Sequence, residues 1–425
     1  MHRSTYYPLL LLIAVLFTTA CNRSGDIPTA KAGLSPDAIA ASIPQLLDRS
    51  AAIQNGKEWD DVQNYYGAQR QAIMANPDAL EPRLKLAELF IQEARVTGEH
   101  PHYYPAALQM LEDVLTRITQ ADPAQLKIDQ KDYLFRALSA KASVQLSLHD
   151  FAPALATASR AVTINPYNAQ IYGALVDANV ELGHYAEAVK MADKMVSIRP
   201  DLRSYSRVSY LREIHGDVPG AVKALEMAIG AGYPGQESTA WVRLTLGNLY
   251  KTYGDWKNAA LQYEMILAER PDYPFAIAAL GEVELHQKHY ANAEERLQKA
   301  CAIIPEVGYF EKLAELYQKT GRKTEFEVLV PKILDMMQED MAKGHNMRLE
   351  LARFYTDLMP DYDKALQNAR AEYEQRPDNI DVNRLLARIY TLKKDKVRAQ
   401  EHLAKAGQTG SKHPELEELK KMLKS

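Results

Sequence analysis

Residues 240–273 read AWVRLTLGNLYKTYGDWKNAALQYEMILAERPDY, and this stretch decides the fold. Gly247 and Ala259 are small residues that stand twelve positions apart, on opposite sides of a Gly-Asp turn. Small residues in these places let two antiparallel helices approach each other closely. Pro271 then stops the second helix, and Asp272 offers a side-chain cap to the helix that follows. The stretch therefore predicts one helical hairpin that is followed directly by another.

The same pattern recurs along the chain at a spacing of about 34 residues. The alanine of the second helix is present in seven of eight units: Ala154, Ala188, Ala221, Ala259, Ala293, Ala365 and Ala399. Twelve residues upstream, the first helix carries a small residue in seven units: Ala142, Ser209, Gly247, Gly281, Ala314, Ala352 and Ala387. The exceptions are Val176 and Phe326, and Phe326 shares its helix with Pro331, where we expect a local bend or loosened packing. Because the period repeats in register, the chain is predicted to be a repeat array.

This pattern resembles the tetratricopeptide repeat, and residues 240–273 match that family at nearly every consensus position. The resemblance covers about two thirds of the chain and implies an all-α fold, a right-handed α-solenoid of helix-turn-helix repeats. We assign residues 131–412 to an array of about eight repeats. Residues 36–130 have a helical pattern but match the repeat poorly, so we interpret them as an irregular helical region with degenerate repeats. Residues 413–425 are predicted to form a capping helix that covers the apolar face of the last unit.

Residues 1–20 have the layout of a secretory signal peptide. The apolar stretch Tyr6–Phe17 carries no charge and is too short to span a bilayer as a helix. Thr18-Thr19-Ala20 then precede Cys21, an arrangement that resembles the lipobox of bacterial lipoproteins, in which the cysteine is acylated and cleavage makes it the first residue. That family prefers Leu where Thr18 stands, and Thr-Thr-Ala also suits ordinary signal peptidase. A soluble secreted or periplasmic product is therefore the alternative to a lipoprotein.

Asn22 directly follows the cysteine, and by resemblance to enterobacterial sorting this favours the outer membrane. Residues 21–35 are rich in Gly, Pro, Ser and Ala, which predicts a flexible tether. Such a tether would span roughly 20 Å on average. We therefore expect a protein of the bacterial cell envelope, anchored to the membrane by a lipid at Cys21, with its folded body close to the membrane surface.

Composition and motifs argue against several classes of function. Lys and Arg total 51 and Asp and Glu total 55, for a formal net charge of -4, so nucleic acid is not an expected partner. The two cysteines exclude a disulfide framework and a cysteine-based zinc site, and Cys301, beside the small Ala300 of a second helix, is predicted to be buried. The sequence contains no Gly-rich phosphate loop, Gly-x-Ser-x-Gly or His-Glu-x-x-His motif. We predict no enzymatic activity, no cofactor and no bound metal.

By resemblance to the family, the first helices of successive units line a concave groove. The candidate partner-binding residues in the middle of this groove are Arg203, Tyr210, Trp241, Leu244, Asn248, Lys251, Phe275 and Glu282. Aromatic anchors among amide and charged groups suit an extended peptide or a partner helix. The alternative is that Trp241 and Phe275, which open their helices, pack against the preceding unit. A Lys-plus-Asn clamp for a terminal carboxylate is not supported, because Leu244 stands where the lysine belongs.

The sequence thus favours a membrane-anchored scaffold or adaptor that mediates protein–protein interactions in assembly, secretion or export. Its expected partners are other envelope proteins or peptides. The alternative function is that of an accessory protein that binds carbohydrate or polysaccharide through its concave surface, with the aromatic side chains stacked on sugar rings.

Overall fold

The structure is a computed structural model that describes residues 35–54, 56–118 and 126–424, and the regular elements in these ranges are all helices. The expected all-α solenoid is confirmed over this part of the chain. The predicted signal peptide (residues 1–20), Cys21 and the tether up to residue 34 lie outside the described residues.

The N-terminal elements are α1 (Pro36–Ala41), the short 3-10 helix η1 (Ala51–Ile53), α2 (Lys57–Ala75), α3 (Glu81–Thr97) and α4 (His100–Ile118). The helices that follow are α5 (Ile128–Ser147), α6 (Phe151–Ile164), α7 (Ala169–Glu181), α8 (Tyr185–Ile198), α9 (Leu202–Ile214), α10 (Val218–Gly230), α11 (Glu237–Thr252), α12 (Trp256–Glu269), α13 (Pro274–His286), α14 (Tyr290–Ile303), α15 (Val307–Lys319), α16 (Lys323–Ala342), α17 (Arg348–Asp357), α18 (Tyr362–Gln375), α19 (Ile380–Leu392), α20 (Lys396–Ala406) and α21 (Pro414–Lys424).

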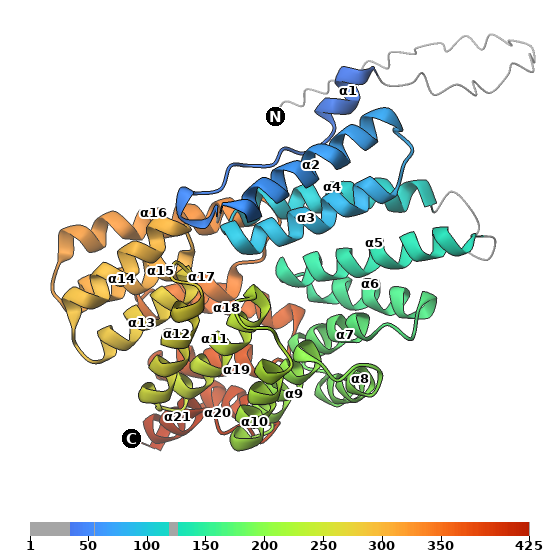
Figure 1. The fold of residues 1–425 in the computed structure, drawn as a ribbon. Helices are drawn as coiled ribbons and strands as arrows, with labels where there is room; N and C mark the ends of the chain where they lie inside the picture. The colour runs from blue at the N-terminus through green and yellow to red at the C-terminus, as the bar shows by residue number, and fades with distance from the viewer. Residues whose placement is uncertain (1–34, 55, 119–125, 425) are drawn as a thin grey trace, which may run out of the picture.

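From α5 to α20 the helices pair as consecutive hairpins, and the hairpins stack on one another (Figure 1). The small residues explain how closely the paired helices pack. The seven alanines of the second helices are all fully buried. A Cβ atom on Gly247 would lie 2.3 Å from Cε1 of Tyr263 in the partner helix. The hairpin of α11 and α12 therefore has no room for a larger side chain at position 247.

The unit formed by α15 and α16 departs from the pattern, as the sequence predicts. Helix α16 continues through Pro331 and is 20 residues long, whereas the second helices of the other units have 11 to 14 residues. Of its side chains, Ile333 and Met337 are buried. Phe326, in the alanine position, is partly buried and contacts the cores on both sides of α16. Helices α15 and α16 contact each other less extensively than the paired helices of the other units, and α16 itself is not broken.

The segment between α1 and α2 crosses α3 and α4, and we call it the strap. The backbone N–H of Leu47 donates to the hydroxyl of Tyr103 on α4 at 3.0 Å. Arg49 in this strap is buried and donates two hydrogen bonds, of 2.8 and 2.7 Å, to the buried carboxylate of Glu93 on α3. Ile53 then reaches the apolar cluster formed by α13, α14 and α15. The strap therefore joins the start of the fold to units near its middle.

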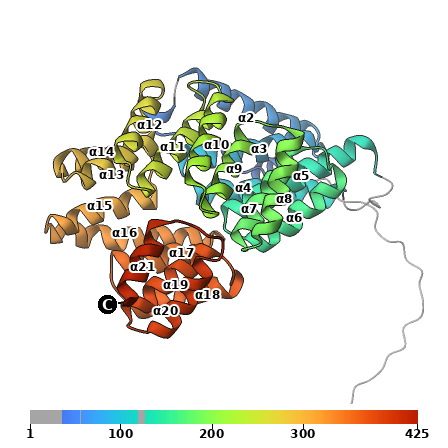
Figure 2. The same cartoon turned by 90° about the horizontal axis from the view of Figure 1, so that it is seen from below.

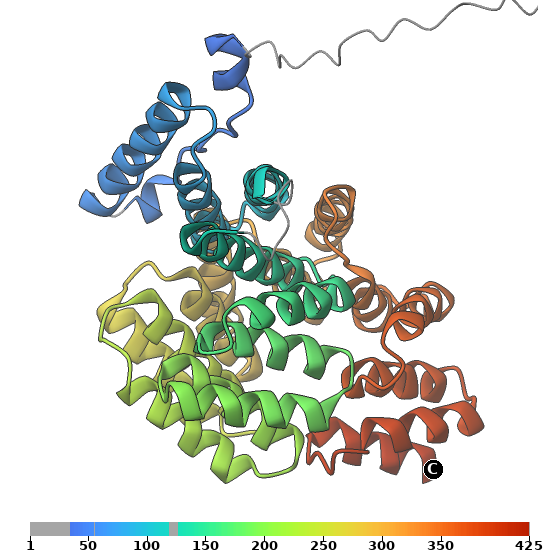
Figure 3. The ribbon, with the colours of Figure 1, turned by 90° about the vertical axis from the view of Figure 1, so that its right-hand side faces the viewer.

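The stack of hairpins coils back on itself, so that α17–α21 lie beside α5–α10 (Figures 2 and 3). Helix α21 packs against α19 and α20 with Leu416, Leu419 and Leu423 buried. Among the helices described, none combines the length and the apolar character that a membrane span requires.

Candidate functional site

We define the inner surface as the one formed by the first helices of the units, α7, α9, α11, α13, α15, α17 and α19. The candidate residues lie on α9, α11 and α13, but they are not equally accessible. Trp241 and Tyr210 are 47% and 37% exposed. Leu244 is 6% exposed and packs in the core between α11, α12 and α13, so the expectation that it lines the groove is corrected. Arg203 is exposed, and the other candidates are partly buried.

An aromatic row runs along three successive first helices. The ring centroids of Trp241 and Phe275 are 5.5 Å apart, and those of Phe275 and Tyr309 are 6.0 Å apart, both in edge-to-face arrangement. The three residues stand 34 positions apart, so they occupy the same place in their units. Tyr309 was not among the predicted site residues, although this spacing is visible in the sequence. Phe275 packs on Trp241 of the preceding unit, as the alternative interpretation predicts, whereas the ring contact of Trp241 is with the following unit and nearly half of its surface stays exposed.

Three of the polar candidates, Asn248, Lys251 and Glu282, are engaged within the protein. Lys251 pairs with Glu282 at 3.0 Å, and Lys312 of the next first helix lies 4.0 Å from the same carboxylate. The hydroxyl of Tyr263 donates to Oδ1 of Asn248 at 2.8 Å. The ion pairs link α11, α13 and α15, and the hydrogen bond of Asn248 links α11 to α12. These polar candidates therefore stabilise the inner surface, and a partner would have to compete for them.

Helices from distant parts of the chain face each other across this surface. The negative charge of Asp381 on α19 raises the pKa of Tyr210 on α9 well above its usual value. Burial raises the pKa of Glu213 to about 7, and Asp381 acts in the same direction. The inner surface is narrow here because the coil brings α9 and α19 together.

Positive charge also gathers at one place on the inner surface. Burial, followed by the charges of Arg207 and Arg95, lowers the pKa of Arg203. Arg207 is paired with Asp177 at 2.6 Å. Arginines from α9 and α3 are thus close enough to repel one another.

The first and second halves of the coiled array contact each other at three places, and each contact joins a hairpin turn to a loop between units. Three hairpin turns of the first half, at His149, Gly183 and Gly216, contact three inter-unit loops of the second half, at Asn346, Asp378 and Gly410. We call these three contacts together the clasp. The Nδ1 atom of His149 lies 3.0 Å from the carbonyl oxygen of Asn346. A Cβ atom would lie 2.5 Å from the carbonyl carbon of Asp378 if placed on Gly183, and 2.5 Å from the carbonyl oxygen of Gly410 if placed on Gly216.

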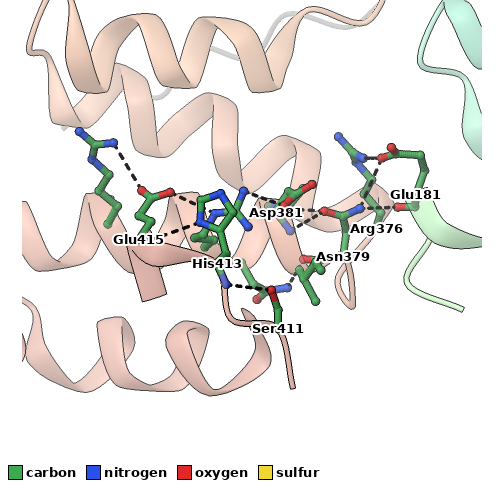
Figure 4. Close-up of polar contacts among 12 residues, drawn as sticks. Glu181, Arg376, Asn379, Asp381, Ser411, His413 and Glu415 are labelled. Atoms are coloured by element: carbon green, nitrogen blue, oxygen red, sulfur yellow. Dashed lines mark hydrogen bonds and ion pairs between the residues drawn. The ribbon is translucent and has the colours of Figure 1, made fainter. Parts of the chain in front are cut away.

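An ion network occupies the middle of the clasp (Figure 4). Glu181, at the end of α7, approaches from a separate helix and accepts hydrogen bonds from Arg376 and from the side chain of Asn379. Arg376 is buried and is also paired with the buried Glu372. The guanidinium carbon of Arg376 lies 4.7 Å from the ring centre of Phe151. Burial raises the pKa of Glu181 in spite of the opposing charge of Arg376.

A cavity of about 400 Å³ lies in the clasp beside this network, lined by both halves of the chain. His149 and His345 border it, with ring centroids 4.6 Å apart, and His100 lies 6.4 Å from His345. Neither ring nitrogen of His345, nor Oε2 of Glu350, has a hydrogen-bond partner among the described residues. On the side of the clasp formed by the second half of the chain, some buried polar atoms therefore lack a hydrogen-bond partner among the described residues.

Among the residues described, no group of three or more His, Cys, Asp or Glu side chains is placed to hold a metal ion. Cys301 is partly buried rather than fully buried, which corrects the expectation, and burial raises the pKa of its thiol to about 11.

Comparison with solved structures finds other repeat solenoids. The chain is similar to a thermophilic TPR protein of Thermus thermophilus, with 20% identity and a TM-score of 0.40 over 49% of this chain and 100% of that one. It is similar to a tetratricopeptide repeat protein of Parabacteroides merdae, with 16% identity and a TM-score of 0.35 over 69% and 99% of the two chains. It is also similar to PilW, a type IV pilus biogenesis factor, with 12% identity and a TM-score of 0.40 over 55% and 97%.

These similarities are at the level of the fold. No family profile matches the chain, and no curated protein sequence matches it.

Proposed function

We propose that this protein is a membrane-anchored scaffold of the bacterial envelope that binds other envelope proteins or peptides on its inner surface. The observation that carries the proposal is the aromatic row of Trp241, Phe275 and Tyr309, in which the Trp241 ring remains accessible. A rigid aromatic side chain that is already held by its neighbours loses little conformational freedom on binding, which suits it as an anchor for a partner.

The membrane anchor belongs to the same proposal and is supported by the sequence. Cys21 follows a charge-free apolar stretch and three small or hydroxylated residues, and a short tether precedes the folded body. A lipid at Cys21 would hold the inner surface near other proteins of the same membrane. Replacement of Cys21 by Ser is expected to move the protein from the membrane fraction to the soluble fraction.

A photo-crosslinking amino acid placed at position 241 in living cells tests the binding surface. We expect crosslinks to one or a few defined envelope proteins. The matched control is the same crosslinker at Tyr233, an equally aromatic residue that is exposed in the loop between α10 and α11. Equal crosslinking at both positions would contradict the proposal.

The exposed Trp241 ring also favours the alternative, a carbohydrate-binding accessory protein, because sugar rings stack on aromatic faces. Binding of purified protein to a polysaccharide array distinguishes the two. If Trp241→Ala abolishes glycan binding and position 241 captures no protein, the alternative is the better function.

A further inference from the structure

We propose that the clasp is a releasable joint, and that its opening moves α17–α21 away from α5–α10 and admits the partner to the inner surface. This inference rests on the proposed function, because it concerns access to the surface where the partner would bind. It concerns the regulation of that site and assigns no new ligand to it.

The contacts across the clasp are mainly polar. The backbone N–H of Ile380 donates to the hydroxyl of Tyr185 at 2.8 Å, and the backbone N–H of Asn346 donates to the carbonyl of Leu148 at 3.0 Å. The hydroxyl of Thr409 donates to the carbonyl of Ile214. Ile380 adds one apolar contact, to the cluster formed by α7, α8 and α9. Polar contacts can be exchanged for contacts with water at a small net cost, whereas buried apolar surface cannot.

The moving part has a core of its own. Eleven buried residues of α17–α21 form one apolar cluster with no buried member from α5–α10. Beyond the clasp, α17 is held mainly by α15 and by α16, the loosened helix. Opening the clasp therefore leaves the interior of α17–α21 intact, as expected for a joint between two packed bodies.

The closed clasp also contains unfavourable features. The buried nitrogen atoms of His345 and Oε2 of Glu350 find no hydrogen-bond partner among the described residues. A buried polar atom without a partner has lost its hydration without compensation. Opening would let water reach these atoms. The closed state is thus stabilised by a few polar contacts and opposed by these costs.

The turn glycines provide a direct test with a matched control. Gly183 and Gly254 lie at the same place in their hairpins, with φ of +82° and +85°. Substitution by Ala strains the backbone equally at both. A Cβ on Gly183 would clash with the backbone of Asp378 across the clasp, whereas no atom of the described residues lies within 4 Å of a Cβ on Gly254. The two variants therefore strain their own turns alike, and they differ in whether the added methyl group meets the opposite side of the clasp.

The readout is amide hydrogen exchange of the full-length protein, measured at Ile380 and Asn346. Ile380 is the first residue of α19, so its N–H has no partner within the helix and reports the contact with Tyr185. Gly183→Ala is expected to raise exchange at both amides at least tenfold, and Gly254→Ala less than twofold. Equal exchange in the two variants would overturn the proposal.

A second pair of variants tests whether opening admits the partner. Glu181→Gln removes a charge-assisted bond across the clasp and leaves Arg376 paired with Glu372. Glu187→Gln removes a similar charge from an exposed pair within α8. We expect Glu181→Gln to increase exchange at Ile380 roughly tenfold and to accelerate photo-crosslinking at position 241 severalfold, whereas Glu187→Gln changes neither.

The outcomes separate the two proposals. Faster exchange with an unchanged crosslinking rate would leave a mobile clasp but overturn its role in admitting the partner. Absence of specific crosslinks at position 241 in every variant would overturn the proposed function and the gating role with it. Unchanged exchange in Glu181→Gln would overturn the releasable joint, whatever the crosslinking shows.

Discussion

The hydroxyl of Tyr185 accepts a hydrogen bond of 2.8 Å from the backbone N–H of Ile380, a residue 195 positions further along the chain. Tyr185 opens the second helix of one unit, and Ile380 opens the first helix of a unit in the next turn of the coil. Two residues that each begin a helix of a repeat unit thus form a contact between the two halves of the molecule.

Replacing Tyr185 by Phe tests the contribution of this hydrogen bond. The variant leaves a buried N–H without its partner, and we expect a loss of about 1 kcal/mol in the free energy of unfolding together with faster exchange at Ile380. The control is Tyr172→Phe, which removes a bond of 3.0 Å to the carbonyl of Pro166 within the same region. Exchange at Ile380 should not change in the control. Urea denaturation and hydrogen exchange measure the two effects.

The tight packing of the hairpins predicts opposite effects for two helical glycines. In Gly247→Ala the added methyl would lie 2.3 Å from the Tyr263 ring, so we expect a loss of about 1–3 kcal/mol in the free energy of unfolding. In Gly67→Ala, within α2, the methyl meets no atom of the described residues within 4 Å, so the better helix propensity of Ala should stabilise by about 0.5–1 kcal/mol. Thermal denaturation of both variants checks the prediction, which fails if the two shifts have the same sign.

The buried pair of Arg49 and Glu93 predicts a strong effect of charge removal. Arg49→Met leaves the carboxylate of Glu93 buried without its cation, and we expect a loss of about 3–5 kcal/mol in the free energy of unfolding. Lys57→Met, which breaks the exposed pair with Asp61, should cost less than about 0.5 kcal/mol. Chemical denaturation compares the two. Addition of Glu93→Leu to Arg49→Met should recover part of the loss.

The environment of His345 predicts a pH dependence of stability. Burial, followed by the nearby His149 and His100, lowers the pKa of His345 from 6.5 to about 3. Because the unfolded chain binds a proton below pH 6.5 and the folded protein does not, this group contributes stability above pH 6.5 that is lost as the pH falls toward 3. Asp340, whose carboxylate lies 4.0 Å from Nδ1 of His345, acts in the opposite direction, since burial raises its pKa to about 6.

The variant His345→Phe separates the effect of the histidine on the pH dependence of stability from that of the carboxylates. Relative to the unmodified protein, the variant should gain about 2–3 kcal/mol in the free energy of unfolding between pH 7 and pH 4.5, because its unfolded state no longer takes up this proton. Urea denaturation at the two pH values measures the difference. A constant difference between variant and unmodified protein across this range would contradict the lowered pKa.

Most of the hairpin architecture could be predicted from the sequence, because the groups that determine it are neighbours along the chain. Ala259, for example, meets its packing partners within its own unit and the next. The candidate surface was only partly predictable. The sequence pattern does not separate Leu244 from Trp241, because their burial depends on how far each unit is rotated against the next. The spacing of 34 residues that relates Trp241, Phe275 and Tyr309 is present in the sequence, but only the structure shows that their rings contact one another.

The sequence alone determined that the chain forms paired helices at a period of about 34 residues, because small side chains, turn glycines and closing prolines act over distances shorter than one unit. The tertiary structure decided that the array coils until its two halves touch, that glycine turns such as Gly183 meet the loops of the second half, and that Leu244 is buried. The path of the coil is the sum of many small rotations between units. Each rotation depends on side-chain packing that no single motif encodes, so contacts between residues nearly 200 positions apart follow only from the whole.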